Sequence, residues 1–291
     1  MQRSRKSGYA LLLVLVTLTI CALALTGLAT RSMQANSDSL ERLRALQSRW
    51  GRLSCSRTLL RDAPAVFDAI EKKMLASDQL SKPIFPIALT ETVELGGHRF
   101  TMVLADENAK LNLNMLQRLG RPGTLATSLR KVLGPNSNRA LRDIDRNPGS
   151  RTLSSWGEVF DLKVLRTLQG SDRVLAELTR EVTLWGSGKL NLRRASPSSL
   201  ELACKGIVTD GLARRIVERH DESPTLNTGL LLQQTVLNET DRGQLEQLLG
   251  DGSTTFSVWI ESEDGRQRSQ HYSVSYVDGD GKRSTESFSL N

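Results

Sequence analysis

Apolar residues run without interruption through the first part of the chain. A short leader with three basic residues precedes residues 9–29, which include no charged side chain, and Arg31 ends the run. A helix of roughly 20 apolar residues is long enough to cross the hydrocarbon core of a bilayer. Because positive charge stays preferentially on the cytoplasmic side, we expect a single-pass membrane helix with a cytoplasmic N-terminus and an exported, periplasmic body.

Three kinds of processing fit this N-terminus. A secretory signal has an apolar core of roughly 7–15 residues before a small-residue cleavage site, and residues 22–24, Ala-Leu-Ala, offer such a site inside a longer apolar run. A second interpretation is an uncleaved signal anchor. In the third, prepilin-type processing, the leader is removed after Gly8, Tyr9 becomes the first residue, and the apolar helix is retained. Gly at the end of a basic leader, followed by an aromatic residue and a full-length span, favours the third.

The helical pattern continues beyond the apolar run. Large apolar residues recur there at steps of three, four or seven positions, with charged residues between them: Leu40, Leu43, Leu46, Trp50, Leu53 and Leu60. This amphipathic pattern predicts one helix from residue 9 to about 61, roughly 80 Å long at 1.5 Å per residue. From Leu43 onward we interpret the apolar side as packing on the protein's own body; the alternative is a face that binds a partner. Pro64 predicts a break.

Alternation of apolar and polar residues predicts β-strands near the middle and at the end of the chain. Residues 90–95 and 98–104 alternate on either side of two glycines, a pair that favours a tight hairpin turn. Residues 254–260, 269–277 and 284–290 alternate as well, and Asp–Gly turn signals separate them. These segments predict an antiparallel sheet.

The residues between the two groups of strands, 105–250, are predicted to be mostly helical. Ser196 before Pro197 is a good helix start, because Ser caps the helix and Pro fits its first turn. Further helices are predicted to start near Asp210, Asn227 and Glu239. Strands on both sides of a helical block predict one sheet with a helical domain inserted into it. We therefore expect an α+β fold with these parts: a leader (1–8), a transmembrane and amphipathic helix (9–62), a pilin-like β domain (63–104 and 254–291) and an inserted α-helical domain (105–253).

Composition adds few candidates for chemistry. The formal net charge is +7, and the leader supplies three of the positive charges. Cys21 lies in the apolar helix, so Cys55 and Cys204 are either one disulfide or two free thiols. The three histidines lack metal-binding spacing, and no Gly-x-Ser-x-Gly nucleophile motif occurs. The sequence therefore does not indicate an enzyme.

Two polar motifs occur within the helical block, and a shorter one, Leu-Ser-Ser-Trp-Gly-Glu-Val at 153–159, lies between them. Asn side chains hydrogen-bond nearby backbone and tolerate unusual dihedral angles, so we interpret the motifs as fixing tight turns. The first motif is an acidic pair followed by Lys-Leu-Asn-Leu-Asn, with the residues Asp106, Glu107, Asn112 and Asn114. The second runs from 185 to 197 and contains Lys189, Asn191, Ala195, Ser196 and Pro197.

In their order and spacing these motifs resemble the K-type minor pseudopilins of bacterial type II secretion, the general secretion pathway protein K family, over residues 1 to about 260. Arg193 departs from the pattern, because the family usually has a second Asn there. Leu13 is the fifth residue after Gly8, where most prepilin-type proteins carry Glu. The K-type family typically lacks this Glu, so Leu13 agrees with the resemblance.

The resemblance implies a pilin-like long helix and sheet, interrupted by a large helical domain that contains a helix-hairpin-helix or SAM-like module. It implies a non-enzymatic role at the tip of the type II secretion pseudopilus, in the bacterial inner membrane. Its partners would be other minor pseudopilins and the prepilin peptidase, with no nucleic acid. Family members can hold calcium in the inserted domain, but the ligands do not map onto this sequence. A minor pilin of a type IV pilus is an alternative.

Residues 205–208, Lys-Gly-Ile-Val, raise a second function. Two short helices joined by such a turn resemble a helix-hairpin-helix, which grips the DNA backbone through a glycine-rich turn that exposes N–H groups. Val208 stands where the usual turn has its second glycine. The surrounding arginines are offset by nearby acidic residues, and we interpret the mixed surface as solvated: Arg193, Arg194, Arg214, Arg215 and Arg219. A membrane-anchored DNA-binding protein is the alternative from another class.

Overall fold

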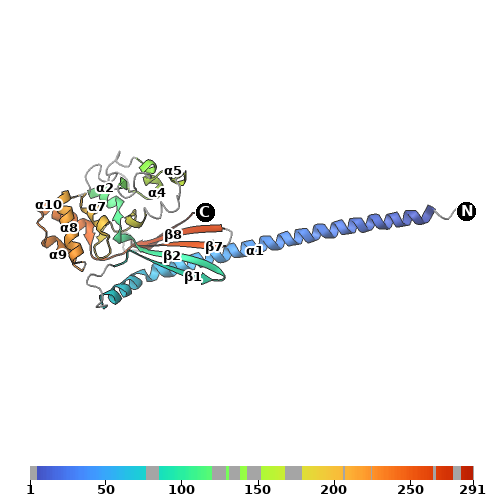
Figure 1. Ribbon diagram of the computed structural model, residues 1–291, viewed down its shortest axis with the longest axis horizontal. Helices are drawn as coiled ribbons and strands as arrows, with labels where there is room; N and C mark the ends of the chain where they lie inside the picture. Colours follow the sequence, from blue (N-terminus) through green and yellow to red (C-terminus); the bar gives the residue numbers. More distant parts are fainter. Residues whose placement is uncertain are drawn as a thin grey trace. The chain divides into compact units, whose positions relative to one another are not determined.

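The computed structural model describes ten segments of the 291-residue chain: 5–76, 85–119, 129–130, 138–142, 152–167, 179–205, 207–223, 225–264, 267–277 and 283–290. The chain divides into two compact units, Met1–Leu53 and Ser54–Asn291. The long helix α1 belongs to both units, whereas the sheet and the helical region belong to the second (Figure 1).

Helix α1 extends from Arg5 to Leu75, so it begins earlier and ends later than predicted. Its N-terminal part is long and apolar enough to cross a membrane, judged by length and composition alone, with a mean hydropathy of 2.6 over 18 residues. The apolar side chains of this part, including those of Tyr9 and Leu13, are exposed. Such a helix is consistent with a single-pass anchor.

The predicted break at Pro64 is wrong, because α1 passes through this residue and continues. A proline inside a helix costs about 3 kcal/mol or more, since it removes a hydrogen bond and its ring clashes with the preceding turn. Leu60, Ala63 and Phe67 are buried against the sheet on either side of it. Burial of one Leu or Phe side chain contributes roughly 1.5–3 kcal/mol. Packing on the sheet therefore outweighs the local cost.

The large apolar residues along α1 differ in how exposed their side chains are. Leu60 is buried and Leu53 is partly buried, which agrees with packing on the protein's own body. Leu43, Leu46 and Trp50, however, are 51%, 52% and 64% exposed. The interpretation that the stripe packs on the body from Leu43 onward is therefore wrong for its first two turns.

The sheet has five antiparallel strands in the order β1-β2-β7-β8-β9. Their bounds are Ala88–Leu95 (β1), His98–Asp106 (β2), Phe256–Asp264 (β7), Gln267–Val277 (β8) and Arg283–Leu290 (β9). Gly96 and Gly97 form the β1–β2 turn with φ of 60° and 78°, which L residues rarely adopt. The pairing of β2 with β7 confirms the predicted single sheet interrupted by a helical block. The turn predicted at 278–281 lies outside the described residues.

The two faces of the sheet have different contacts. One face packs on the second part of α1, where the rings of Phe67 and Phe256 stack with centroids 5.6 Å apart. This core also contains five further strand residues: Phe100, Met102, Leu104, Val258 and Ile260. Alternation places Trp259 and Tyr272 on the opposite face, because they are direct partners across β7 and β8. That face meets the helical region.

The described part of residues 107–250 is mainly helical, and helices begin close to the four predicted starts. Two short parallel strand pairs, β3–β4 and β5–β6, were not predicted. Leucines are the most frequent residues of its core, which also contains Trp156, Phe160 and Ile216. The elements are η1 (Glu107–Ala109), β3 (Leu111–Asn112), α2 (Leu113–Leu119), η2 (Asn138–Ala140), α4 (Trp156–Val159), α5 (Leu162–Thr167), β4 (Val182–Thr183), β5 (Leu190–Asn191), α7 (Pro197–Lys205), α8 (Asp210–Glu222), α9 (Thr228–Gln233), α10 (Glu239–Leu248) and β6 (Leu249–Gly250).

The cysteines are free thiols in separate places. Cys55 lies on α1 beside the helix–sheet core, and Cys204 lies in the core of the helical region. Of the two alternatives for this pair, the structure therefore has free thiols and no disulfide. Full burial raises the pKa of Cys204 to about 12, so this thiol is inert as a nucleophile at neutral pH.

Candidate functional site

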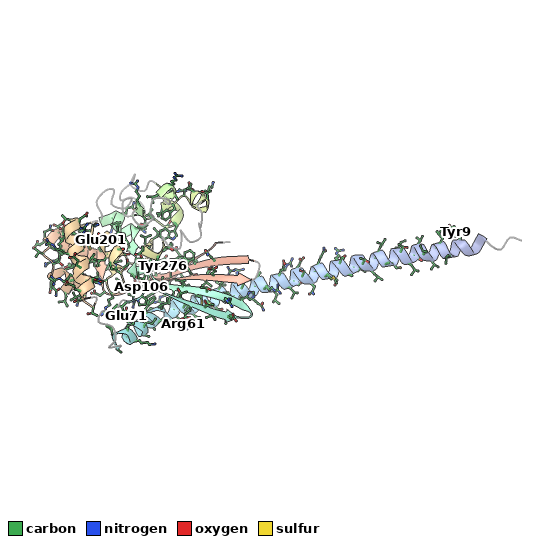
Figure 2. The ribbon with its side chains drawn as sticks, viewed as in Figure 1. Tyr9, Arg61, Glu71, Asp106, Glu201 and Tyr276 are labelled. Atoms are coloured by element: carbon green, nitrogen blue, oxygen red, sulfur yellow. The ribbon has the colours of Figure 1, made fainter. Side chains whose placement is uncertain are left out.

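A buried polar junction forms where the chain leaves the sheet and returns to it. The chain leaves at Asp106, the last residue of β2, and re-enters at Phe256, the first residue of β7, and these two residues are direct partners in the sheet. Asp106 is fully buried. Figure 2 labels it together with Glu71 of α1, on the same part of the molecule. The three sequence motifs meet around this point.

Asn108 connects both ends of the helical region. Its side-chain nitrogen donates to Ser187 Oγ at 2.9 Å and to the carbonyl of Lys189 at 3.1 Å. Its side-chain oxygen accepts from the backbone N–H groups of Thr254 and Thr255, both at 3.0 Å. One amide thus holds the first motif, the second motif and the entry to β7 together.

Asn112 and Asn114 join the first motif to the other two. The Asn112 side chain donates to the carbonyl of Trp185 at 2.8 Å. The Asn114 side chain donates to the carbonyls of Leu184 and Leu153 at 2.8 and 3.0 Å, and accepts from the N–H of Leu153 at 2.7 Å. The predicted role of these asparagines was to fix local turns. Asn112 does so, because its side-chain oxygen accepts from the N–H of Met115 at 3.0 Å, but the two side-chain nitrogens donate to partners 39 to 73 residues away.

Asn191 of the second motif does fix a local turn. Its side-chain oxygen accepts from the N–H of Arg193 at 3.1 Å, and its carbonyl accepts from the N–H of Ala195 at 2.9 Å. Its side-chain nitrogen donates to Ser253 Oγ at 2.7 Å and approaches Asp106 Oδ2 at 3.3 Å. The turn is therefore bound to the end of β2 and to the residues before β7.

Arg194 is the centre of the junction, and its side chain is only 5% exposed. Its Nε donates to Glu71 Oε1 at 2.6 Å, and one terminal nitrogen donates to Asp106 Oδ2 at 2.8 Å. The other terminal nitrogen lies 3.6 Å from Asp68 Oδ1. The guanidinium lies over the ring of Phe67, 4.7 Å from its centroid. Arg194 thus ties the second part of α1 to the sheet and to the second motif.

A second buried ion pair lies beside the first. Lys110 Nζ donates to Glu107 Oε1, and both side chains are almost fully buried. The hydroxyls of Thr183 and Ser257 also donate to the Glu107 carboxylate. Burial, together with the negative charge of Glu107, raises the pKa of Tyr272 well above its ordinary value. This carboxylate is compensated by one cation and several hydroxyls, as a buried charge requires.

The second motif ends in a capped helix. Pro197 is the first residue of α7, and Ser196 Oγ accepts from the N–H of Ser199 at 3.0 Å, which confirms the predicted helix start. The Ser196 hydroxyl donates to Glu181 Oε2 at 2.7 Å. Lys189 is exposed, and it contributes its carbonyl to the junction rather than its charge.

A chain of aromatic rings continues from the junction to the sheet. Trp185 of the second motif lies against Tyr272 of β8, with centroids 5.3 Å apart, and edge-on to Trp156 of the middle motif at 5.8 Å. Trp156 stacks with Phe160, and Tyr272 contacts Trp259 at 4.8 Å. Each such pair contributes about 0.5–1.5 kcal/mol beyond burial. The helical region is therefore fastened to the sheet by rings as well as by ions.

The structure separates the predicted site residues into two groups. The junction brings together the motif residues Asp106, Glu107, Asn112, Asn114, Lys189, Asn191, Ala195, Ser196 and Pro197. Gly8, Tyr9 and Leu13 lie instead in the first turns of α1. No measurement on the structure tests cleavage after Gly8, which stays a prediction.

Sequence reasoning missed Arg194 and Asn108 as the residues with the most partners. Arg194 was assigned to a solvated mixed surface, and its burial makes that assignment wrong, whereas Arg193, Arg214, Arg215 and Arg219 are exposed. In the sequence, the indication of a structural role for Arg194 was its position between Asn191 and Ala195, two residues of the second motif. The signal for Asn108 was its place directly after the acidic pair.

Two described N–H groups of the turn proposed for DNA binding are used within the turn itself. The N–H groups of Ile207 and Val208 both donate to the carbonyl of Cys204, at 2.9 and 2.8 Å. Both side chains are buried in the helical core. These two donors therefore do not point to a phosphate, and this observation disfavours the DNA-binding alternative.

The described carboxylates are not arranged as a calcium site. Among the described residues, no group of three or more His, Cys, Asp or Glu side chains has an arrangement that could hold a metal ion. The buried acids of the junction, Glu71, Asp106 and Glu107, are each paired with Arg194 or Lys110. We therefore assign no metal ligand.

His220 of α8 provides a titratable contact with the second motif. Its Nε2 lies 2.8 Å from the carbonyl of Leu192, and burial lowers its pKa, although this contact and Asp221 oppose the shift. An unfolded His has a pKa of about 6.5. As the pH falls through that value, His220 of the unfolded chain therefore takes up a proton before His220 of the folded protein does.

We expect the free energy of unfolding to be unaffected by His220 above about pH 7.5 and to fall progressively below about pH 6.5. In His220→Gln, which keeps a neutral donor, this part of the pH dependence disappears. Urea unfolding of both proteins between pH 5 and 8 measures it. Parallel stability curves for the two proteins would show that His220 does not contribute.

The class that the fold defines is pilin-like: a long N-terminal apolar helix packs on an antiparallel five-stranded sheet, and a helical region is added to it. No family model and no curated protein matches the chain. A chain in the crystal structure of the GspK-GspI-GspJ complex from the enterotoxigenic Escherichia coli type 2 secretion system is similar, with a TM-score of 0.44 and 15% identity, over 86% of this chain and 99% of that chain. The functional assignment therefore rests on the residues of this chain.

Proposed function

We propose that this chain is a minor pseudopilin of the K type, which supports protein export from the tip of a type II secretion pseudopilus. The observation that supports this most is the convergence of the motifs. The residues on which the resemblance rests are scattered over 106–197, yet they bond to one another around Asp106 and Asn108. If the likeness of these short motifs were due to chance, we would not expect their residues to lie together and bond to one another in the folded protein.

The role is mechanical rather than catalytic. The apolar part of α1 anchors the chain in the inner membrane, with the leader in the cytoplasm and the body in the periplasm. Prepilin peptidase removes residues 1–8, and the mature chain assembles with other minor pseudopilins. Leu13 supplies no carboxylate for an ion pair in the membrane, where an unpaired charge is costly. This suits a terminal subunit, above which the bulky helical region prevents further addition.

Processing after Gly8 is the direct test. We expect the mature protein to begin at Tyr9, and we expect Gly8→Val to leave at least nine-tenths of the chain unprocessed, because the added branched side chain occupies the cleavage site. N-terminal sequencing of the protein from membranes with active prepilin peptidase measures both. Ser7→Ala, one residue earlier, is the control and should be processed normally.

Two other N-termini would contradict the proposal. An intact Met1 indicates a plain signal anchor, and a mature protein that begins after Ala24 indicates a secretory signal. Loss of export of type II substrates with pili unaffected, in a strain without this protein, separates the pseudopilus from a type IV pilus.

A further inference from the structure

One segment of α1 is strongly cationic. Residues 42–61 contain six arginines and no acidic residue: Arg42, Arg44, Arg49, Arg52, Arg57 and Arg61. The nearest acids are Glu41 and Asp62 at its two ends, and Asp62 pairs with Arg61. These arginines and the basic leader together exceed the formal net charge of +7. The remainder of the chain is therefore net acidic, and the positive charge is concentrated on this helix.

An exposed apolar stripe begins just before this segment and continues into it, formed by Leu40, Leu43, Leu46 and Trp50. These side chains are 47%, 51%, 52% and 64% exposed, and their spacing of three and four residues places them along one side of the helix. A stripe of large apolar residues that is exposed beyond the membrane span marks an interaction site.

We propose that the exposed stripe binds an amphipathic helix of a different protein chain, whose own apolar stripe is flanked by Asp and Glu. This inference rests on the proposed function, because it names the kind of partner that a fibre subunit holds through α1. The apolar spacing at Leu43, Leu46 and Trp50, three then four residues, is the spacing by which helices interdigitate. The flanking arginines favour a partner with carboxylates at the edges of the contact, because opposite charges across an interface attract and like charges repel.

Other occupants fit less well. A second copy of this chain would place arginines against arginines, and like charges at about 4 Å repel by about 1 kcal/mol per pair even in water. Nucleic acid phosphates would neutralise the arginines but would leave Leu46 and Trp50 in contact with water. Lipid buries apolar side chains at its interface, but Leu46 lies 17 residues after Ala29 on one continuous helix, roughly 25 Å further along it and beyond the headgroup layer. A helix with both apolar and acidic sides satisfies the two features together.

Site-specific photo-crosslinking in cell membranes tests the contact. A photoreactive amino acid at Leu46 is expected to capture one partner chain. The same amino acid at Ala45, which is exposed on another side of α1, is the matched control and should capture at least about tenfold less, the ratio for a difference of 1.4 kcal/mol. Mass spectrometry of the product should show a segment with apolar residues at three- and four-residue steps and a net negative charge.

Charge reversal tests whether the arginines select an acidic partner. Arg42→Glu with Arg49→Glu should lower the Leu46 crosslink about tenfold or more, whereas Arg42→Lys with Arg49→Lys should retain it. Arg214→Glu with Arg215→Glu makes the same change in net charge on an exposed side of α8 and should have no effect. Crosslinks only to lipid, to nucleic acid or to a second copy, equal capture at Ala45, or a crosslink unaffected by charge reversal would overturn the proposal.

The two proposals can fail separately. If the mature chain does not begin at Tyr9 but Leu46 still captures an acid-flanked helix in an arginine-dependent manner, the pseudopilin role is wrong and the helix-binding stripe stands. If Tyr9 is the mature N-terminus and Leu46 captures no more than Ala45, the stripe is not the contact surface and the pseudopilin role is unaffected.

Discussion

Replacing Arg194 with Met is expected to lower the free energy of unfolding by about 3–5 kcal/mol. The substitution keeps most of the aliphatic stem but removes the guanidinium that compensates Glu71 and Asp106, both of which are buried. Two carboxylates in a water-excluded site without a cation are far more costly than the intact cluster. Urea unfolding of the full chain in detergent, followed by tryptophan fluorescence, measures the loss. Trp185 lies close to the junction and reports on it.

Arg193→Met is the matched control. Arg193 is half-exposed, and its terminal nitrogen lies 3.6 Å from Glu71 Oε2, so its loss should cost less than about 1 kcal/mol. Adding Asp106→Asn to the Arg194→Met protein should restore part of the stability, because it removes one of the uncompensated charges. Equal effects of the two arginine substitutions would show that burial of the ion cluster is not what stabilises the junction.

Replacing Asn108 with Leu is expected to cost a similar amount, about 3–5 kcal/mol. The side chain makes four hydrogen bonds, and the substitution leaves the N–H groups of Thr254 and Thr255 without their acceptor. A buried donor without a partner costs about 1–3 kcal/mol. Asn108→Asp keeps the acceptor for the two threonines but should be no less destabilising than Leu, because its second carboxylate oxygen faces the carbonyl of Lys189 and adds a buried charge beside Asp106 and Glu107. The same urea experiment measures all three proteins.

Asn238→Leu is the control for Asn108. Asn238 is also an asparagine that accepts from a backbone N–H, but it is the exposed cap of α10 and its loss should cost about 1 kcal/mol. If Asn108→Leu destabilises the protein no more than Asn238→Leu does, the bonds that cross the junction do not stabilise the fold, and the entry to β7 is held by the sheet alone.

Such a junction matters for the proposed role. The helical region is attached to the sheet at the end of β2 and the start of β7, which are neighbouring strands. Two covalent connections at one point would act as a hinge. The bonds of Asn108 reinforce that point, and the bond of Arg194 to Glu71 of α1 and the ring contact of Trp185 with Tyr272 add attachments away from it. A terminal subunit that blocks further addition requires this rigidity.

Local patterns were sufficient where neighbouring residues decide the structure. The β1–β2 hairpin, the C-terminal strands and the capped start of α7 at Ser196 follow from alternation, from Gly96-Gly97 and from Ser-Pro chemistry. These depend on adjacent residues alone, so their physical cause is visible in the sequence. A single sheet shared by the strands on both sides of the helical block was predicted as well, whereas the structure shows that β2 and β7 are the strands that pair.

By itself, then, the sequence determined the apolar helix, the strands, the helix starts and the single interrupted sheet, because each is set by periodicity or by turn chemistry. Only the tertiary structure decided that α1 continues through Pro64, that Arg194 is buried, and that Leu43, Leu46 and Trp50 are exposed. Each of these depends on which surface another part of the chain covers. Packing energies of several kcal/mol outweigh local preferences there, and no pattern of neighbouring residues records that outcome.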